Sequence, residues 1–471
     1  MTKITNHTEV TIIGGGPGGL SAAYELVNQG ISVSLIDENS MLGGQFLRQL
    51  TPEFIKNKKS FLDINIKEYN QLLNLINNPY FIYINNSIVW NILDEMVVVY
   101  VQNNQTKLIS SNYIIVASGA YDRAVPFPGW TLPGVMTVGG VLNLLKSQLI
   151  LPGKNIIVSG NGALILLIAN YLNYAGANIL EVLESSNHKL NLVDIIKLFY
   201  VPSLFKKGIA FRLNLMLSGI PYKTGEIIVE AKGDKIVEEV IIAPINSEGK
   251  TDLSRSRTVI TDILITGFGL TSSSEITQFI GCEHNYNALK GGWIPIRTKC
   301  FETTIKNVFS VGDCAGIKGS DIASCEGRIA GITALNRIKN NFSINKNKLN
   351  HFQNKLKKYN NFQNIINKIY LPPNNYLSLI NKNTIICRCE DVTYGDLLTY
   401  LDQNIYDIRS LKSVSRAGMG KCQGRNCLGT IISILEQNNC SHVFDNNPNY
   451  RPPLKPVLIS DLIEKEFKVI D

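Results

Sequence analysis

Four cysteines near the end of the chain have a spacing that could hold metal ions. They form two close pairs, Cys387 with Cys389 and Cys422 with Cys427, and 32 residues separate the pairs. Four thiolates in two pairs suit either a Zn(Cys)₄ site or a [2Fe–2S] cluster. A single residue lies between Cys387 and Cys389, fewer than the roughly two to four typical of a zinc-binding pair, which favours the cluster.

A redox-active disulfide between Cys422 and Cys427 is a third interpretation. It is disfavoured because such a pair should face a flavin from the N-terminal domain, where no cysteine precedes Cys282. Nearby glycines are expected to leave backbone N–H groups free to donate hydrogen bonds to cluster sulfurs. These glycines are Gly418, Gly420 and Gly424.

A second group of residues could bind a dinucleotide near the N-terminus. An apolar run leads into Gly14, Gly16 and Gly19 with the spacing Gly-x-Gly-x-x-Gly, and a helix-like segment follows. This pattern predicts a buried strand turning into a helix N-terminus, where N–H groups and the helix dipole bind a pyrophosphate. Asp37 ends the next predicted strand, 32–36, close to where an acid is expected to meet a ribose hydroxyl. The combination disfavours a simple strand–helix turn without a ligand.

Two later segments indicate that this dinucleotide is FAD. The predicted buried strand 113–120 runs into small residues at Gly119, where a backbone could lie against a cofactor. Another strand ends at Gly312 and Asp313. An acid there can hydrogen-bond the ribityl chain of a flavin, and the next helix N-terminus can stabilise negative charge on the reduced ring. A nicotinamide enzyme needs no such acid; the alternative for Asp313 is an ordinary turn aspartate.

A second strand–turn–helix–strand unit begins about 145 residues after the first. Its turn contains Gly160 and Gly162, and Glu184 lies 24 residues beyond Gly160, repeating the geometry of the first unit. The acid favours NAD over NADP, because a 2′-phosphate would meet a negative charge. Ile165 replaces the third glycine, so the helix and the strand are expected to pack less closely. A working nicotinamide site and a retained fold without a nucleotide both stay open.

The elements that must position these residues follow the order of a duplicated α/β domain. A cluster of Pro and Gly residues between Pro126 and Gly134 predicts that the chain crosses there from one domain to the other. The further predicted strands are 81–85, 97–101, 107–109, 155–159, 178–183, 261–266 and 307–311, with a meander over 223–242. The further predicted helices are 52–75, 163–174, 323–335, 393–401 and 408–414.

The net charge of +8 is unevenly distributed. From Gly327 to Cys389 the chain has eleven Lys or Arg and no Asp or Glu. A nucleic-acid patch is one interpretation, but this Asn- and Lys-rich run has no recognition motif, so a solvated linker or a docking face is favoured.

The sequence shows neither a membrane span nor a secretory signal. No stretch reaches the roughly 20 apolar residues that span a bilayer, and the polar start Met1–Glu9 runs directly into the first strand. Nine cysteines without a signal argue against a disulfide framework. The expected location is the cytoplasm, with peripheral attachment at the inner face of the membrane as an open alternative.

These motifs together resemble the two-dinucleotide-binding-domain flavoproteins of the glutathione/thioredoxin reductase type. Within them the chain resembles the FAD-containing A (or α) subunits of heteromeric amino-acid dehydrogenases, which include opine oxidase, hydrogen cyanide synthase and dye-linked proline or hydroxyproline dehydrogenase. The resemblance rests on Gly14–Gly19, Asp37 with Gly43–Gln45, Ala117–Ala120 with Pro128–Trp130, Gly160–Gly162, Gly291–Trp293, Val311–Asp313, Glu326–Arg328, Cys387–Glu390 and Arg416–Cys427. The last segment is the most specific.

The resemblance implies an α/β fold with two Rossmann-like domains and a small helical [2Fe–2S] domain like bacterioferritin-associated ferredoxin (BFD). That domain usually ends in Cys-x-x-Cys, whereas four residues separate Cys422 from Cys427, as in the dehydrogenase subunits. The expected domains are an FAD domain over 1–122 and 260–336, an inserted NAD-binding-like domain over 123–259, a basic helical linker over 337–382, the BFD-like domain over 383–440 and a tail over 441–471.

The resemblance also implies which residues bind which group. FAD is expected at Gly14, Gly16, Pro17, Gly18, Gly19, Asp37, Glu38, Gly44, Gln45, Gly119, Gly312 and Asp313. The [2Fe–2S] cluster is expected at Cys387, Cys389, Cys422 and Cys427. NAD, left open as a third cofactor, is expected at Gly160, Gly162 and Glu184.

The implied function is that of an FAD-dependent oxidoreductase acting on CH–NH or CH–NH₂ donors as part of a complex. A separate FAD subunit resembling D-amino-acid oxidase would oxidise the amine (proline, hydroxyproline, an opine, sarcosine or glycine), and this chain would relay electrons to a respiratory-chain or dye acceptor. No His or Lys near the flavin motifs stands out as a base, so no catalytic residue is predicted. The alternatives are a stand-alone NADH-dependent flavin/iron–sulfur reductase and a redox-inert assembly subunit with a zinc-bound docking module.

Overall fold

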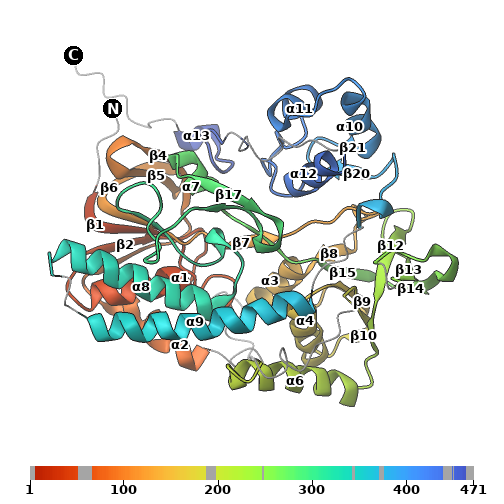
Figure 1. The fold of residues 1–471 in the computed structure, drawn as a ribbon, viewed down its shortest axis with the longest axis horizontal. Coiled ribbons are helices and arrows are strands. Elements are labelled where there is room, and N and C mark those ends of the chain that lie inside the picture. Colours follow the sequence, from red (N-terminus) through yellow and green to blue (C-terminus); the bar gives the residue numbers. More distant parts are fainter. Residues whose placement is uncertain are drawn as a thin grey trace.

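The computed structural model describes residues 6–50, 66–186, 198–246, 249–341, 345–370, 376–438, 448 and 450–462. Within them the chain forms two large β-sheets flanked by helices and a small helical unit near the C-terminal end (Figure 1). In this described part of the chain, no helix is both long enough and apolar enough to cross a membrane.

The first sheet carries the N-terminal glycine turn. Its strands lie in the order β3 (Phe81–Ile84), β2 (Val33–Ile36), β1 (Asn6–Ile13), β6 (Gln105–Val116), β5 (Val97–Gln102) and β4 (Ile88–Leu93), and β19 (Val308–Ser310) also pairs with β6. The first half of β6 pairs antiparallel with β5, and its second half pairs in parallel with β19. Because β1, β2, β6 and β19 are mutually parallel, their carboxyl ends meet at one edge of the sheet.

Helices α1 (Pro17–Val27), α2 (Ile66–Leu73) and α8 (Ser320–Ile338) cover one face of this sheet, and α9 (Lys346–Ile369) packs outside them. Glycines allow α1 and α8 to approach closely, since a Cβ at Gly327 would lie 2.0 Å from the carbonyl oxygen of Gly18. Glu25 of α1 is buried and is paired with Arg328 of α8 at 2.7 Å and with Lys348 of α9 at 2.5 Å. One carboxylate thus joins three helices.

The second sheet is entirely parallel and carries the second glycine turn. Its strands lie in the order β11 (Tyr222–Thr224), β10 (Asn178–Glu184), β9 (Asn155–Gly160), β15 (Ile263–Gly267) and β8 (Val135–Thr137). Helices α3 (Val138–Gln148), α4 (Ala163–Tyr174) and α6 (Pro202–Leu217) lie on one face, and the meander β12 (Glu226–Lys232), β13 (Glu239–Pro244) and β14 (Arg257–Ile260) lies on the other. The two-stranded ribbon β7 (Ala120–Asp122) and β16 (Leu270–Ser272) lies where the chain leaves the first sheet and returns.

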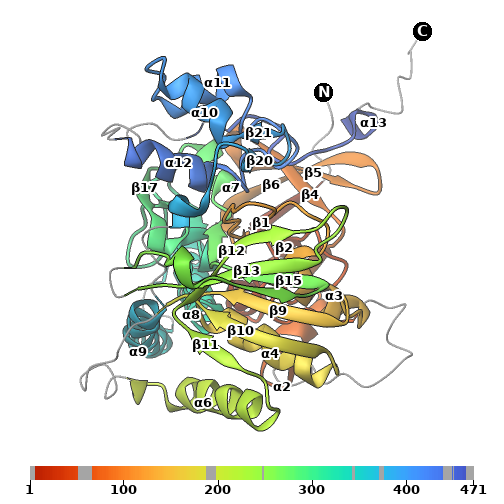
Figure 2. The same cartoon turned by 90° about the vertical axis from the view of Figure 1, so that its right-hand side faces the viewer.

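The small C-terminal unit, here called the cysteine unit, comprises residues 376–438. It contains the short strands β20 (Ile385–Cys387) and β21 (Val392–Thr393) and the helices α10 (Tyr394–Leu401), α11 (Ile408–Ser415) and α12 (Leu428–Gln437) around a core of its own. The unit lies beside α7 (Glu275–Ile280) and the hairpin β17 (His284–Asn287) and β18 (Gly292–Pro295), at the opposite end of the molecule from α6 (Figure 2).

The predicted fold class is confirmed: two α/β units each place a glycine turn after a buried strand, and a small helical unit holds the cysteines. Helix α4 has the predicted bounds, and α10 and α11 differ from the predicted ones by one residue. The prediction of separate strands at 107–109 and 113–120 was wrong, because β6 runs unbroken from Gln105 to Val116 while changing partners. Of the predicted helix 52–75, residues 52–65 lie outside the described part, and α2 covers Ile66–Leu73.

Candidate functional site

The three glycines of the first turn meet different surroundings. Gly14 follows β1 with φ +110°, and a Cβ there would lie 2.2 Å from the carbonyl oxygen of Ala117 on the strand β6 side. A Cβ at Gly19 would lie 2.0 Å from the carbonyl oxygen of Gly14, which holds helix α1 against β1. A Cβ at Gly16 would meet no atom within 4 Å, so packing does not require a glycine at that position. Pro17 is the first residue of α1, where its missing N–H costs no hydrogen bond.

The two predicted acids after β2 have different partners. Asp37 is buried, accepts a hydrogen bond from the backbone N–H of Gly15, and accepts two more from Asn39 at 2.7 and 2.8 Å. Glu38 is half-exposed and is paired with Lys455. Burial opposes the ionisation of Glu38, but Lys455 and more distant arginines outweigh it and lower the pKa of the carboxyl. The carboxylate of Asp37 thus braces the glycine turn, and that of Glu38 lies at the surface.

The glycine-rich segments that follow β2 and β6 lie beside the first turn. Gly44 has φ +59°, and a Cβ there would lie 2.8 Å from the Cα of Gly16. Gln45 is exposed. Gly119 has φ +72°, and its carbonyl oxygen accepts a hydrogen bond from the N–H of Ser273 at 3.0 Å. The structure therefore brings the first turn, Gly44 and the end of β6 to one edge of the first sheet.

The turn at Gly312 and Asp313 completes this edge. Asp313 Oδ1 accepts hydrogen bonds from the N–H groups of Lys318 at 2.9 Å and Gly319 at 3.0 Å, and burial raises the pKa of its carboxyl. The turn is next to the start of α1, since a Cβ at Gly18 would lie 3.4 Å from a methyl of Val311. An acid held this way by backbone donors is suited to hydrogen-bonding a polar chain laid along the edge.

A buried charge network beneath this turn was not assigned a role from the sequence. Glu326 of α8 is 1% exposed and is paired with Arg297 at 2.8 Å and Lys318 at 3.1 Å. It also accepts a hydrogen bond from the N–H of Gly312 at 2.9 Å. Burial opposes its ionisation, but Arg297 and Lys318 lower its pKa overall. Glu326 therefore fixes the Gly312–Asp313 turn from below; the only sequence signal was its place in the Glu326–Arg328 motif.

The second turn is built like the first. A Cβ at Gly160 would lie 2.1 Å from the carbonyl oxygen of Gly267, and one at Gly162 would meet no atom within 4 Å. Ile165 is buried against Gly267, where a Cβ would lie 2.9 Å from it. The missing third glycine is thus compensated by a glycine on the neighbouring strand β15.

The acid of the second unit is engaged within the protein. Glu184 is 2% exposed and accepts hydrogen bonds from the N–H of Gly162 at 3.2 Å, the hydroxyl of Ser186 at 2.8 Å and the hydroxyl of Tyr222 at 3.3 Å. Burial raises its pKa to about 7 despite these donors. Its carboxylate therefore has little of its surface left for a ribose.

The end of helix α9 lies over this second turn. The side-chain amide of Asn161 donates a hydrogen bond to the carbonyl oxygen of Tyr370 at 2.8 Å. Burial raises the pKa of the Tyr370 phenol to about 12, and the charge of Glu184 contributes in the same direction. Apolar packing of Phe362 and Ile365 against Leu198 holds the helix in this place. The carbonyl group of Tyr370 at the end of α9 therefore contacts the second glycine turn, which precedes the N-terminus of α4.

The four predicted cysteines come together at one end of the cysteine unit. The Cys427 thiol donates a hydrogen bond to Cys387, which lowers the pKa of Cys387 to about 6 and raises that of Cys427. Cys389 and Cys422 also contact each other. All four are free thiols. In the described part of the chain, no group of three or more Cys, His, Asp or Glu is placed so that it could hold a metal ion. Two contacting pairs are the arrangement that two irons with two thiolates each require.

The backbone around the cysteines also fits a cluster. The N–H of Gly418 donates a hydrogen bond to the sulfur of Cys387, as predicted. A Cβ at Gly420 would lie 2.3 Å from the Cβ of Cys389, so this loop needs glycine there for space; that its N–H donates to a cluster sulfur stays a prediction. Gly424 has φ +86° and packs on Leu428. The donor set of four thiols with N–H groups directed at sulfur suits a [2Fe–2S] cluster.

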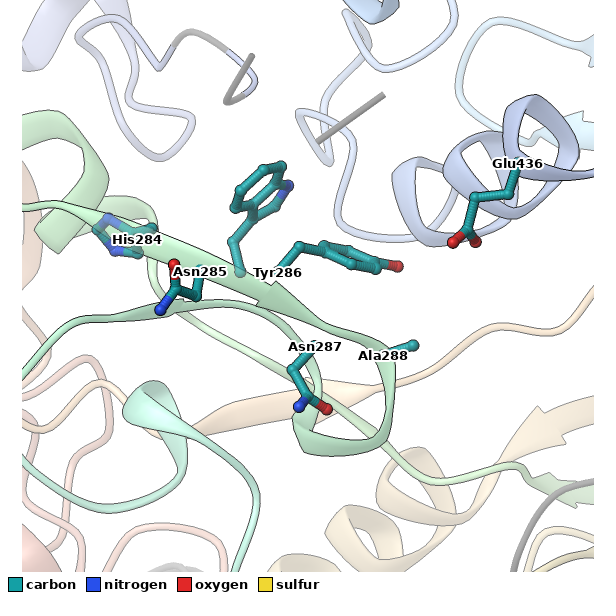
Figure 3. A pocket seen from close by; sticks show the side chains of 7 residues that line it. His284, Asn285, Tyr286, Asn287, Ala288 and Glu436 are labelled. Carbon is teal, nitrogen blue, oxygen red and sulfur yellow. The ribbon is translucent and has the colours of Figure 1, made fainter. Parts of the chain in front are cut away.

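One cavity lies away from these residues. It measures about 480 Å³ and is an open hollow between the β17–β18 hairpin and helix α12, with Tyr286 and Glu436 on opposite sides (Figure 3). Burial raises the pKa of Glu436. None of the predicted site residues lines this cavity.

Comparison with known families divides the chain into two parts. Residues 8–334 match the family described as pyridine nucleotide-disulphide oxidoreductase, and residues 385–437 match the BFD-like [2Fe-2S] binding domain. The first match indicates FAD and the second a [2Fe–2S] cluster, so the predicted cofactors FAD and [2Fe–2S] are confirmed.

Several relatives match over nearly the whole chain. The HcnB protein of the hydrogen cyanide synthase from Pseudomonas aeruginosa is 31% identical over 92% of this chain and 93% of its own length. The A subunit of opine oxidase from Agrobacterium tumefaciens is 27% identical over 98% of this chain and 92% of its own length. Among solved structures, L-proline dehydrogenase from P. horikoshii has the same fold, with a TM-score of 0.72 and 19% identity over 98% of this chain and 81% of that one.

Proposed function

This chain belongs to the pyridine nucleotide-disulphide oxidoreductase family, and from that premise we propose that it is the FAD- and [2Fe–2S]-containing electron-transfer subunit of a multi-subunit amino-acid or imino-acid dehydrogenase. One observation carries the proposal: a flavin-type glycine turn is joined to a cysteine quartet, while no cysteine in the sequence precedes Cys282. The dithiol chemistry that gives the family its name thus has no candidate in the N-terminal domain, and the cysteine quartet supplies a different electron carrier.

We assign the FAD to the edge of the first sheet. Gly14, Gly16 and Gly19 would admit its pyrophosphate to the N-terminus of α1, and Asp313 would accept a hydrogen bond from its ribityl chain. The open space at Gly16 supports this assignment, because Gly14 and Gly19 are explained by packing alone. FAD supplies reversible two-electron chemistry and the cluster supplies one-electron chemistry when both are bound.

The structure weighs against the stand-alone NADH-dependent reductase. Asn161 of the second glycine turn is hydrogen-bonded to the carbonyl oxygen of Tyr370, and Glu184 is buried among hydrogen-bond donors of the protein. Electrons would therefore enter from a partner. The relatives that match most of the chain are named as subunits, which supports a hetero-oligomer.

We propose that the partner is an FAD subunit resembling D-amino-acid oxidase, and that electrons leave to a respiratory-chain or dye acceptor at the inner face of the membrane. Helix α9 presents exposed lysines, including Lys357 and Lys358, to a partner. Because α9 buries Phe362 and Ile365, deleting the helix would also damage this chain. Charge reversal at Lys357 and Lys358 is the cleaner test of docking through this helix.

The test of the proposed function is a reduction experiment with and without the partner. The chain is co-expressed with a flavoprotein encoded beside it, purified, and mixed anaerobically with proline, hydroxyproline, sarcosine, glycine or an opine. We expect one amine to bleach the flavin of the complex, and neither an amine nor NADH to bleach the isolated chain. Rapid bleaching of the isolated chain by NADH would contradict the proposal.

A further inference from the structure

A continuous polar chain leads from the cysteine loop to the end of strand β6. The guanidinium of Arg425 donates a hydrogen bond to the carbonyl oxygen of Cys422 at 3.2 Å and lies 2.8 Å from a carboxylate oxygen of Glu275. The other oxygen of Glu275 accepts a hydrogen bond from the hydroxyl of Ser273 at 2.9 Å. The N–H of Ser273 in turn donates to the carbonyl oxygen of Gly119 at 3.0 Å. Three residues therefore connect a predicted cluster ligand with the predicted flavin edge.

The charges in this chain are shielded from solvent. The side chain of Glu275 is 4% exposed and that of Arg425 is 17% exposed. A buried ion pair costs desolvation of both groups, and replacing the pair by apolar residues is often neutral or stabilising. Stability alone is therefore a weak reason for such a pair between two units of a protein. The pair does restrict the geometry, because Arg425 lies against Glu275 and also donates hydrogen bonds to the carbonyl oxygens of Cys422 and Leu454.

The same loop has further anchors on the C-terminal segment. Gln423 donates a hydrogen bond to the carbonyl oxygen of Pro453 at 2.8 Å, and Arg425 donates a second one to that of Leu454 at 3.1 Å. A small cavity of about 50 Å³ beside the ribbon β7–β16 is lined by Tyr121, Arg425 and Tyr450 among others. Tyr121 is two residues beyond Gly119. The residues that line this small cavity therefore lie between the predicted flavin edge and the cysteine loop.

We propose that Arg425, Glu275 and Ser273 are positioning residues that hold the cysteine loop at a fixed separation from the flavin edge of the first sheet. The inference rests on the proposed function, since it concerns electron exchange between the two cofactors of this chain. Electron transfer between two bound groups slows steeply as their separation grows. Loosening the chain of contacts should therefore slow this exchange while leaving both cofactors bound.

The test follows the exchange directly in the isolated holoprotein. Light with a sacrificial donor reduces the flavin, and the appearance of the reduced cluster is followed by its EPR signal and visible absorbance. We expect Arg425→Met and Glu275→Gln to slow cluster reduction about tenfold or more, the scale that small misplacements of reacting groups have. Arg425→Lys should recover most of the rate, because it restores the charge opposite Glu275. The contents of FAD, iron and acid-labile sulfide and the EPR spectrum after dithionite reduction should be unchanged.

Arg416→Met is the matched control. Arg416 is also an arginine of the cysteine unit paired with a carboxylate, Glu390 at 2.7 Å, but its side chain is 71% exposed and the pair stays within the unit. Its rate of cluster reduction should equal that of the unaltered chain. Rates of cluster reduction in Arg425→Met and Glu275→Gln equal to that of the unaltered chain would overturn the proposal. Loss of iron from both variants would also overturn it, because it would mean that the pair retains the cluster. Light reduction needs neither an amine nor a partner subunit. The result can therefore be interpreted even if the proposed dehydrogenase function is wrong.

Discussion

Among the individual residues, Gly16 bears most directly on cofactor binding. A Cβ at Gly14 or Gly19 would clash with backbone atoms, whereas a Cβ at Gly16 would meet no protein atom within 4 Å. The backbone of Gly16 is extended (φ −76°, ψ −177°), which other residues adopt without strain. We therefore propose that the lack of a side chain at Gly16 allows a pyrophosphate to approach the backbone.

Gly16→Val should consequently leave the apoprotein folded and weaken FAD binding. We expect an unchanged thermal midpoint of the apoprotein and at least a tenfold loss of FAD affinity, about 1.4 kcal/mol, measured by flavin fluorescence on reconstitution. Gly208→Val on α6 is the matched control, because a Cβ there also meets no atom within 4 Å. Equal FAD affinity in Gly16→Val and the unaltered chain would contradict the assignment of FAD to this turn.

Glu184 should make the stability of the protein depend on pH. Its pKa rises from 4.5 to about 7 on burial, so between these values the folded chain binds a proton that the unfolded chain releases. Stability from this group is then present below about pH 4.5 and falls as pH rises through 7, by about 3 kcal/mol in total. Urea unfolding between pH 5 and 8 should show this decline in the unaltered chain and a flatter profile in Glu184→Gln. Parallel profiles would refute the buried-acid explanation.

At the scale of elements, the buried carboxylate of Glu25 in α1 links helices α8 and α9 to α1 through ion pairs with Arg328 and Lys348. Arg328 is 16% exposed and also stacks on the ring of Tyr24, with its guanidinium carbon 4.0 Å from the ring centroid, whereas Lys348 is 41% exposed. Arg328→Met should cost about 3 kcal/mol, because it leaves a buried carboxylate with only an exposed partner. Lys348→Met should cost about 1 kcal/mol or less. Urea unfolding of the two variants tests this order, and equal losses would contradict it.

The elements also show which features the sequence could predict. The glycine turns and helix α4 depend on residues that are neighbours in the chain, and the glycine spacing and the apolar pattern predicted them well. The parallel pairing of β6 with β1 and β19 joins segments that are far apart in the chain, so no local pattern predicted it. The hairpin β17–β18 is local, but His284–Asn287 has no alternating apolar pattern that would mark a strand. The contact of Asn161 with Tyr370 joins residues 209 positions apart, and no local pattern marks it. The cysteine quartet was predictable because its spacing is itself the signal.

For the whole molecule, the proposed FAD site and the proposed cluster site lie on either side of the contact between the first sheet and the cysteine unit. The second unit also contacts the cysteine unit, because Ile227 packs with Tyr376 and Leu379, and its glycine turn donates a hydrogen bond to the carbonyl oxygen of Tyr370 at the end of α9. We infer that the two α/β units have diverged, with FAD bound by the first. Electron exchange with a partner then depends on the first unit and the cysteine unit.

The central claim is that this chain holds a flavin and an iron–sulfur cluster together. Its most direct test is the measurement of FAD, iron, zinc and acid-labile sulfide in the anaerobically purified chain, with Cys422→Ser as the control. We expect about one FAD, two irons and two sulfides per chain, with iron and sulfide lost and FAD retained in the control. Zinc without acid-labile sulfide, or flavin alone, would contradict the claim.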